Sequence, residues 1–159
     1  MAHVLALDLS IRSTGYAILN DNELLDYGCF KPPIKLKTFR KIEYNLCKLK
    51  EVLDKHARVR LVVIESAAFA AKGPAREKLA EQQGVIKHWL IAHGYMVAMA
   101  PITAVKKAIT GNGGASKEEM VDAINEQYEM ELSVKQNDIA DAIAIGTWAM
   151  DTGGLALVE

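Results

Sequence analysis

The chain has 159 residues, of which 50% are hydrophobic and 25% are charged, and its formal net charge is −1. This length suits one domain with a single full-sized core, and the near-neutral charge excludes a surface that binds polyanions everywhere. The two cysteines, Cys29 and Cys47, form neither a metal-binding spacing nor a disulfide framework. No apolar run is long enough to span a bilayer and no signal-peptide pattern opens the chain, so we expect a cytoplasmic protein.

Three strands are predicted at the start of the chain. Short apolar runs bounded by turn residues indicate strands over 3–9, 15–20 and 23–30. The turn signal at Asn20–Asn22 makes these strands an antiparallel meander. Apolar residues at steps of three and four then predict an amphipathic helix over 37–56.

The rest of the chain alternates strands and helices. A continuous β-branched run over 60–65 predicts a strand buried on both faces, as in a parallel sheet. Ser116 and Glu119 form a capping box that opens a later helix. The remaining predicted elements are a helix over 74–93, a strand over 95–100, and helices over 101–109, 117–129 and 137–150. No linker or repeat interrupts this order, so the sequence predicts a single α/β domain over 1–159, with a mixed sheet flanked by helices.

Two carboxylates end predicted strands. Asp8 follows the first apolar run, and Glu65 ends the β-branched run. A carboxylate at the end of a buried strand is costly unless a cationic side chain or a metal ion offsets its charge. In open α/β sheets, ligands gather outside the carboxyl ends of the strands, so both acids are candidate site residues.

The last predicted helix offers two more carboxylates. The i, i+3 spacing of Asp138 and Asp141 puts both on one face, about 5–6 Å apart at Cβ, and the otherwise apolar helix must be buried against the sheet. If the four acids meet, divalent cations relieve their repulsion, and hard oxygen ligands suit Mg²⁺ or Mn²⁺. Two such ions about 3.5–4 Å apart clamp the attacking and leaving oxygens of a phosphodiester displacement.

The alternative for each acid is a structural role. A single acid at a strand end is more often structural than catalytic, and Asp138 also suits the positive end of a helix dipole. Asp141 is harder to explain this way, because alanines flank it on an apolar helix. The four acids together therefore favour a metal site.

At these residues the chain resembles the RuvC-type Holliday junction resolvases, within the RNase H-like nucleases. Four blocks carry the resemblance from about residue 4 to 150: Asp8 with Thr14-Gly15, Val63-Ile64-Glu65, Lys106 with Lys117, and Asp138–Ala142. The resemblance implies an RNase H-like mixed five-stranded sheet with helices on both faces. In that sheet the first three strands are antiparallel, and the fourth and fifth are parallel to the first.

The resemblance also implies an activity. It implies a metal-dependent, structure-selective endodeoxyribonuclease that resolves Holliday junctions by paired symmetric nicks, leaving 5′-phosphate and 3′-hydroxyl ends. The implied partners are branched DNA, as a four-way junction, and a second copy of the chain in a homodimer. The implied cofactor is Mg²⁺, two ions per active site, with Mn²⁺ as a substitute. The implied catalytic residues are the metal ligands Asp8, Glu65, Asp138 and Asp141 and the DNA-contacting lysines Lys106 and Lys117.

The chain departs from the family's pattern at two places. Cellular members usually have Pro-Gly after the first Asp, whereas this chain has Leu9-Ser10. Gapless alignment over 65–84 places Phe69 one position beyond the aromatic that those members use at the junction centre, where this chain has Ala68. Both departures resemble the phage-borne branch, which would place the protein in the host cytoplasm.

Basic residues supply candidate DNA contacts. Lys72, Arg76 and Lys78 lie beside Phe69, and such cations with one aromatic can unstack and cover a base at the crossover; the alternative is that Phe69 fills the core. Lys107 joins Lys106 before the Gly-rich loop 111–114, which either cradles phosphate or acts as a hinge. Ten basic and three acidic residues lie within 31–60, either as a phosphate-tracking patch or as a solvated helix face.

Four rival functions remain. A relaxed flap or fork nuclease and an RNase H-like RNA-processing enzyme would use the same acids, and cleavage of a substrate panel separates them. A catalytically silent junction-binding module would bind DNA without nicking it in Mg²⁺. An actin-like nucleotide-binding domain has a phosphate loop similar to residues 8–15, but this chain is short for its two lobes, and ATP binding is the test.

Overall fold

A computed structural model describes residues 3–66, 72–153 and 155–158. A five-stranded mixed sheet forms the centre of the domain, in the order β3-β2-β1-β4-β5. Its strands are β1 (His3–Asp8), β2 (Thr14–Asn20), β3 (Glu23–Phe30), β4 (Val59–Ser66) and β5 (Met96–Pro101). The first three strands are antiparallel, β4 is parallel to β1, and β5 is parallel to β4, which confirms the predicted topology.

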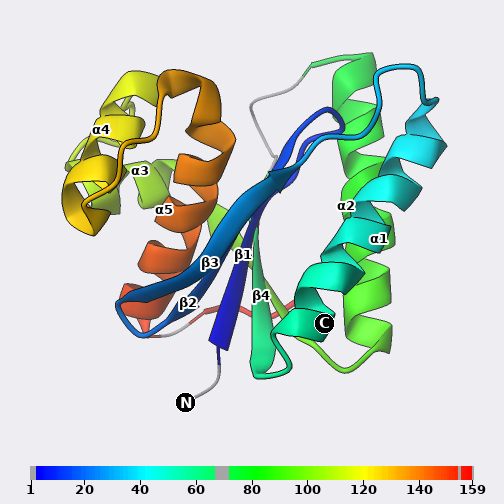
Figure 1. Cartoon of the computed structure of the whole chain (residues 1–159), viewed down its shortest axis with the longest axis horizontal. Helices are drawn as coiled ribbons and strands as arrows, with labels where there is room; N and C mark the ends of the chain where they lie inside the picture. The colour runs from blue at the N-terminus through cyan, green and yellow to red at the C-terminus, as the bar shows by residue number, and fades with distance from the viewer. Residues whose placement is uncertain (1–2, 67–71, 154, 159) are drawn as a thin grey trace.

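Helices cover both faces of the sheet (Figure 1). The helices α1 (Thr38–Lys55) and α2 (Pro74–Ala92) lie on one face, and α3 (Ile102–Thr110), α4 (Lys117–Tyr128) and α5 (Asn137–Thr152) lie on the other. The described elements begin and end within two residues of their predicted bounds. A short 3₁₀ turn, η1 (Val134–Gln136), lies in the connection before α5, where no element was predicted.

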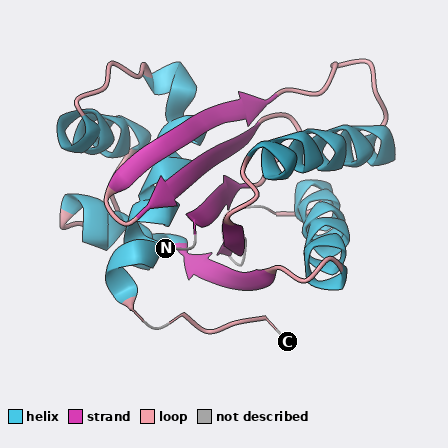
Figure 2. Cartoon of the chain, turned by 60° about the horizontal axis from the view of Figure 1, so that its bottom comes forward, coloured by secondary structure: helices cyan, strands magenta, loops and turns pink. Residues whose placement is uncertain are grey.

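The alternation of side chains along the strands divides the interior into two cores. Val4 and Ala6 of β1 pack toward α5, whereas Leu5 and Leu7 pack toward α1 and α2. The two layers of helices on either side of the sheet are separated in Figure 2. Because both faces are covered, the middle of β4 must be apolar on both sides, which is why residues 61–64 form a continuous apolar run.

One edge of the sheet collects the ends of several elements. The parallel strands β1 and β4 end at this edge, and α1, α2 and α5 begin there, at the top of Figure 1. Residues that follow β1 and β4 therefore meet residues from the first turns of three helices. Among the described helices, none is both long and apolar enough to cross a membrane.

Candidate active site

Parallel pairing of β1 with β4 brings the first two acids together. Leu7 pairs with Ile64 in the register of these strands, so Asp8 and Glu65 occupy the next positions at the same end. Glu65 lies close enough to Asp8 to raise the pKa of the Asp8 carboxyl. The strand-end acids expected from the sequence thus form a close pair.

The start of α5 brings the other two acids to the same place. Gly15 pairs with Asp8 across the β1–β2 ladder, and a Cβ atom at Gly15 would overlap the carbonyl group of Asp138. The backbone of α5 therefore rests directly on β2 at this point, and only glycine permits the approach. This contact positions Asp138 and Asp141 beside the strand-end pair.

The four acids are electrostatically coupled. Burial raises the pKa of Asp8 well above its ordinary value, and the hydrogen bond and charge of Glu65 and the charges of Asp141 and Asp138 raise it further. Burial, together with the charges of Glu65 and Asp138, raises the pKa of Asp141 from 3.8 to about 6, although a hydrogen bond from Asn137 and the charge of Lys106 oppose the rise. The unpaired negative charge makes this site a strong attractor of cations.

The donor set fits a hard divalent cation. The four side chains offer carboxylate oxygens, which Mg²⁺ and Mn²⁺ prefer. Within the described residues, no three His, Cys, Asp or Glu side chains are gathered tightly enough to hold an ion as they stand, and mutual repulsion opposes such an approach. A cation held among these carboxylates would offset the negative charge that raises the pKa values of Asp8 and Asp141.

A buried polar network fixes the loop that follows Asp8. The Ser10 carbonyl oxygen accepts hydrogen bonds from Thr14 Oγ1 at 2.8 Å, Gln82 Nε2 at 3.1 Å and Asn45 Nδ2 at 3.4 Å. Asn45 Nδ2 also donates to Gln82 Oε1 at 2.8 Å, and both of these side chains are fully buried. The neighbouring Leu9 is buried in the core beneath α1 and α2, so Leu9-Ser10 anchors this loop from both sides.

A second glutamine of α2 holds the other strand end. Gln83 Nε2 donates to the Glu65 carbonyl oxygen at 3.0 Å. Adjacent glutamines therefore support the backbone at both acid-bearing strands. Gln82, Gln83 and Asn45 are site residues that were not predicted from the sequence. A polar residue within the apolar stripe of a helix is a sequence feature that could have indicated such a residue. Gln82, which lies between Leu79 and Ile86 in that stripe, is an example.

The predicted lysines differ in their placement. Lys106 of α3 is partly buried and close enough to Asp141 to lower the pKa of that carboxyl. Lys107 is exposed one position further along α3, and Lys117 is exposed at the first position of α4. Ser116 caps α4 through the predicted box, accepting from Glu119 N at 3.1 Å while its own N donates to Glu119 Oε2 at 2.7 Å.

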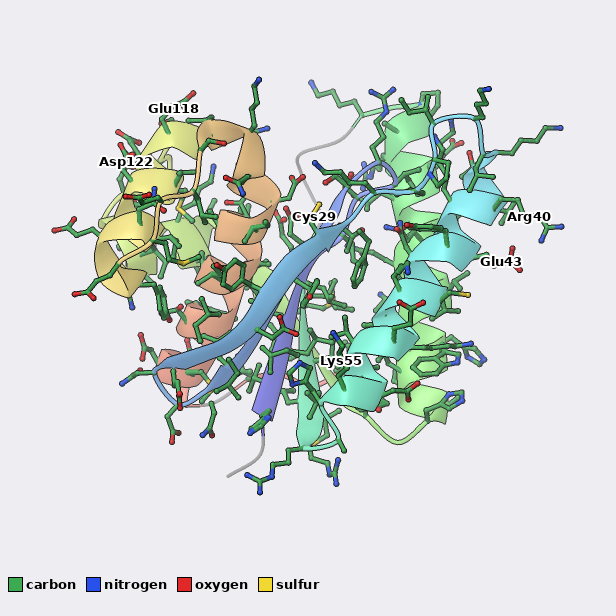
Figure 3. The ribbon with its side chains drawn as sticks, in the orientation of Figure 1. Cys29, Arg40, Glu43, Lys55, Glu118 and Asp122 are labelled. Atoms are coloured by element: carbon green, nitrogen blue, oxygen red, sulfur yellow. The ribbon has the colours of Figure 1, made fainter. Side chains whose placement is uncertain are left out.

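The other predicted DNA contacts lie on the α2 side of the site. Lys72 precedes α2, and Arg76 and Lys78 lie in its first two turns, with all three side chains exposed. Phe69 and Ala68 lie outside the described residues, so the role predicted for Phe69 stays a prediction. Part of the basic run over 31–60 is a solvated face: Arg40 pairs with Glu43 on the outer side of α1 (Figure 3).

Comparisons with known proteins agree on one family. The sequence profile described as "Crossover junction endodeoxyribonuclease RuvC" matches residues 4–148. A protein of that name from Aliarcobacter butzleri (strain RM4018) is 31% identical over 147 residues, covering 89% of this chain and 94% of the relative. A solved structure of Thermus thermophilus RuvC in complex with a Holliday junction substrate is 19% identical, with a TM-score of 0.82 over 99% of this chain and 100% of that one. The yeast mitochondrial Holliday junction resolvase Ydc2 has a TM-score of 0.67 at 13% identity, over 94% of this chain and 78% of that one.

Proposed function

The chain belongs to the crossover junction endodeoxyribonuclease RuvC family, and from this premise we propose that it resolves four-way DNA junctions with a metal site made of Asp8, Glu65, Asp138 and Asp141. The observation that carries the site is the coupling of these carboxylates around Asp8, whose pKa is raised by burial and by the other three acids. The RuvC–junction complex from Thermus thermophilus supports a four-way junction as the substrate.

Divalent cations supply the chemistry that this site needs. When bound, Mg²⁺ or Mn²⁺, two per site, activates water and stabilises the leaving 3′-oxygen of a phosphodiester. The four acids hold the cations and remain ionised once their charge is offset. The products are then 5′-phosphate and 3′-hydroxyl ends.

The remaining residues of the site orient these groups. The hydrogen bonds from Gln82 to the Ser10 carbonyl and from Gln83 to the Glu65 carbonyl hold the two strand ends in place. Lys106, whose charge reaches Asp141, neutralises charge on the scissile phosphate as it builds up. Lys117 contacts the DNA from the start of α4.

A homodimer would give the paired nicks. A four-way junction has approximate two-fold symmetry, and a C2 dimer presents two equivalent sites to it. The exposed apolar residues Val85 and Ile91 on α2, beside the partly buried Trp89, are candidates for this interface. Because the substrate is recombining DNA, we place the protein in the cytoplasm; assignment to the phage-borne branch stays a prediction.

The test is a cleavage panel. Purified protein is incubated with a mobile four-way junction and with linear, flap and RNA–DNA substrates, in Mg²⁺, Mn²⁺ or EDTA. We expect paired nicks in the junction with either metal and none in EDTA. Asp8→Asn is expected to abolish cutting while junction binding remains measurable. Turnover by the wild-type protein in EDTA would refute the metal site.

The same panel decides among the rivals. Preferred cutting of flaps or forks would indicate a relaxed branched-DNA nuclease, and preferred cutting of the RNA strand would indicate an RNA-processing enzyme. Tight junction binding without nicks in either metal would indicate a junction-binding module.

A further inference from the structure

A hollow lies on the side of the sheet covered by α1 and α2, and its lining includes Leu9 and Ser10, the two residues that follow Asp8. It has a volume of about 530 Å³ and is lined by the β1–β2 loop and the first turns of both helices. Its walls carry four cationic side chains and no acidic one: Arg12, Lys37, Lys41 and Lys78. A second hollow of about 550 Å³ shares Lys37 and Lys78 with the first, and its lining also includes Arg40 and two acids, Glu77 and Glu81. The two hollows therefore adjoin and are together called the groove; its four-cation, acid-free part is the first hollow.

No ion pair of the described residues includes any of these four cations. Among the described residues, the ion pairs are Arg40–Glu43, Lys48–Glu51 and His56–Asp26, and none includes a cation of the first hollow. The first turn of α1 holds no acid, and no side chain caps its N-terminus. Arg12, Lys37 and Lys78 are exposed and Lys41 is partly buried. Four unpaired like charges around one hollow repel one another unless an anion enters it.

The position of the groove indicates which anion. Arg12 follows Asp8 by four residues, a distance of at most about 14 Å along an extended chain. One strand of duplex DNA carries a phosphate every ~3.4 Å of helix axis. A strand held at the acids therefore brings its flanking phosphates, within about four nucleotides of the cleavage point, to this groove.

An aromatic side chain beside the groove favours nucleic acid over a small anion. Phe39 lines the second hollow, and 67% of its surface is exposed. A basic groove with an exposed aromatic is the common arrangement for holding unpaired nucleotides, because every base has a face that can stack. Among the described residues, Phe39 belongs to neither of the two buried cores.

We propose that this groove, lined by Arg12, Lys37, Lys41 and Lys78, binds the backbone phosphates that flank the cleavage point, and that Phe39 stacks on a base of the same strand. The inference rests on the proposed function, since it requires DNA at the acids. It assigns the DNA path on the α1–α2 side of the sheet, opposite Lys106 and Lys117, so that the substrate strand is held on both sides of the acids.

The test is the salt dependence of junction binding. Binding of a fluorescent four-way junction is measured in EDTA from 50 to 300 mM salt for the wild type and for K37Q/K41Q. Each phosphate contact contributes about 0.9 to the slope of log K against log salt, so the double variant is expected to lose about 1.8 in slope. Relative to 1 M salt, this corresponds to about a 60-fold loss of affinity at 0.1 M salt.

A matched control removes the same charge elsewhere. K55Q/R58Q alters two exposed cations at and just beyond the other end of α1, where Lys55 is labelled in Figure 3, and is expected to keep the wild-type slope. F39A is expected to weaken binding about tenfold with the slope unchanged, since stacking carries no charge. If K37Q/K41Q fails to melt cooperatively, R12Q, in an exposed loop, takes its place with an expected slope loss of about 0.9.

The outcomes separate this inference from the proposed function. K37Q/K41Q and K55Q/R58Q could show equal slopes while the wild-type protein cuts junctions in Mg²⁺. This result would overturn the proposal that the groove binds phosphates and leave the proposed function intact. Unchanged affinity in F39A would overturn the stacking contact. Wild-type protein that neither binds nor cuts junctions would overturn both.

Discussion

The four-acid site is expected to destabilise the protein when no cation is bound. Asp141 is the clearest probe, because its pKa is raised from 3.8 to about 6 in the folded chain, first by burial and then by the charge of Glu65. Below pH 4 the carboxyl is protonated in both the folded and the unfolded chain, so it does not lower the free energy of unfolding. Between pH 4 and pH 6 the unfolded chain releases this proton first, so stability falls as pH rises, and above pH 6 the loss is complete.

The magnitude follows from the shift. A rise from 3.8 to about 6 corresponds to about 3 kcal/mol, and solvent screening at this partly buried carboxyl reduces the expected cost to about 2 kcal/mol. Asp141→Asn removes the charge and keeps the shape. We expect the variant to be about 2 kcal/mol more stable at pH 8 in EDTA, which raises Tm by about 4–8 °C in a chain of this size.

The assay is thermal unfolding of both proteins in EDTA at pH 4, 6 and 8, and at pH 8 with Mg²⁺. The gain in D141N should vanish at pH 4, and Mg²⁺ should stabilise the wild type more than the variant. Asp122→Asn is the control, because Asp122 is exposed on α4, far from the site (Figure 3). A D141N variant that is less stable than the wild type at pH 8, or whose gain is the same at pH 4, would refute the reasoning.

Three further predictions concern the residues that position the site. Gly15→Ala should push α5 away from β2, which is expected to lower the free energy of unfolding by about 1–3 kcal/mol and to reduce cleavage. Gly84→Ala is the control, because a Cβ at Gly84 meets nothing within 4 Å; cleavage should stay nearly unchanged, and the melting temperature should stay the same or rise slightly. Gln82→Leu should remove a buried donor to the Ser10 carbonyl and lower the free energy of unfolding by about 1–3 kcal/mol. The rate of single-turnover cleavage should fall more than the affinity for the junction. Equal losses of cleavage rate and affinity would contradict a positioning role. Lys106→Gln should lower single-turnover cleavage by about 10²-fold with a smaller effect on binding, and a loss confined to binding would assign this lysine to substrate capture.

The sequence was sufficient for the order of the elements, and it singled out the four acids whose role stays a prediction. The hydrophobic periodicity of strands and helices is a local property of the sequence. The continuous apolar run before Glu65 therefore predicted a strand covered on both faces. The i, i+3 spacing of Asp138 and Asp141 follows from helix geometry alone. For these reasons the predicted topology needed no correction.

The contacts that hold the acids together could not be predicted. The hydrogen bonds of Asn45 and Gln82 to Ser10 join residues 35 and 72 positions apart, and no local pattern specifies which distant carbonyl a buried amide will meet. The close approach of Gly15 to α5 likewise depends on where a helix 122 residues later docks. Such contacts depend on how distant segments pack, and the local hydrophobic periodicity of the sequence does not specify them.

The amino-acid sequence by itself therefore determined the order of strands and helices, and it placed two carboxylates at strand ends and two in the last helix, because periodicity and residue chemistry act locally; the five-stranded arrangement came from the family resemblance. Only the tertiary structure decided that Glu65 lies close enough to Asp8 to raise its pKa, that Lys106 is near enough to lower the pKa of Asp141, and that four of the chain's basic residues line one hollow. Coulomb energies and hydrogen bonds fall steeply with distance, and distances between remote segments exist only in the folded chain.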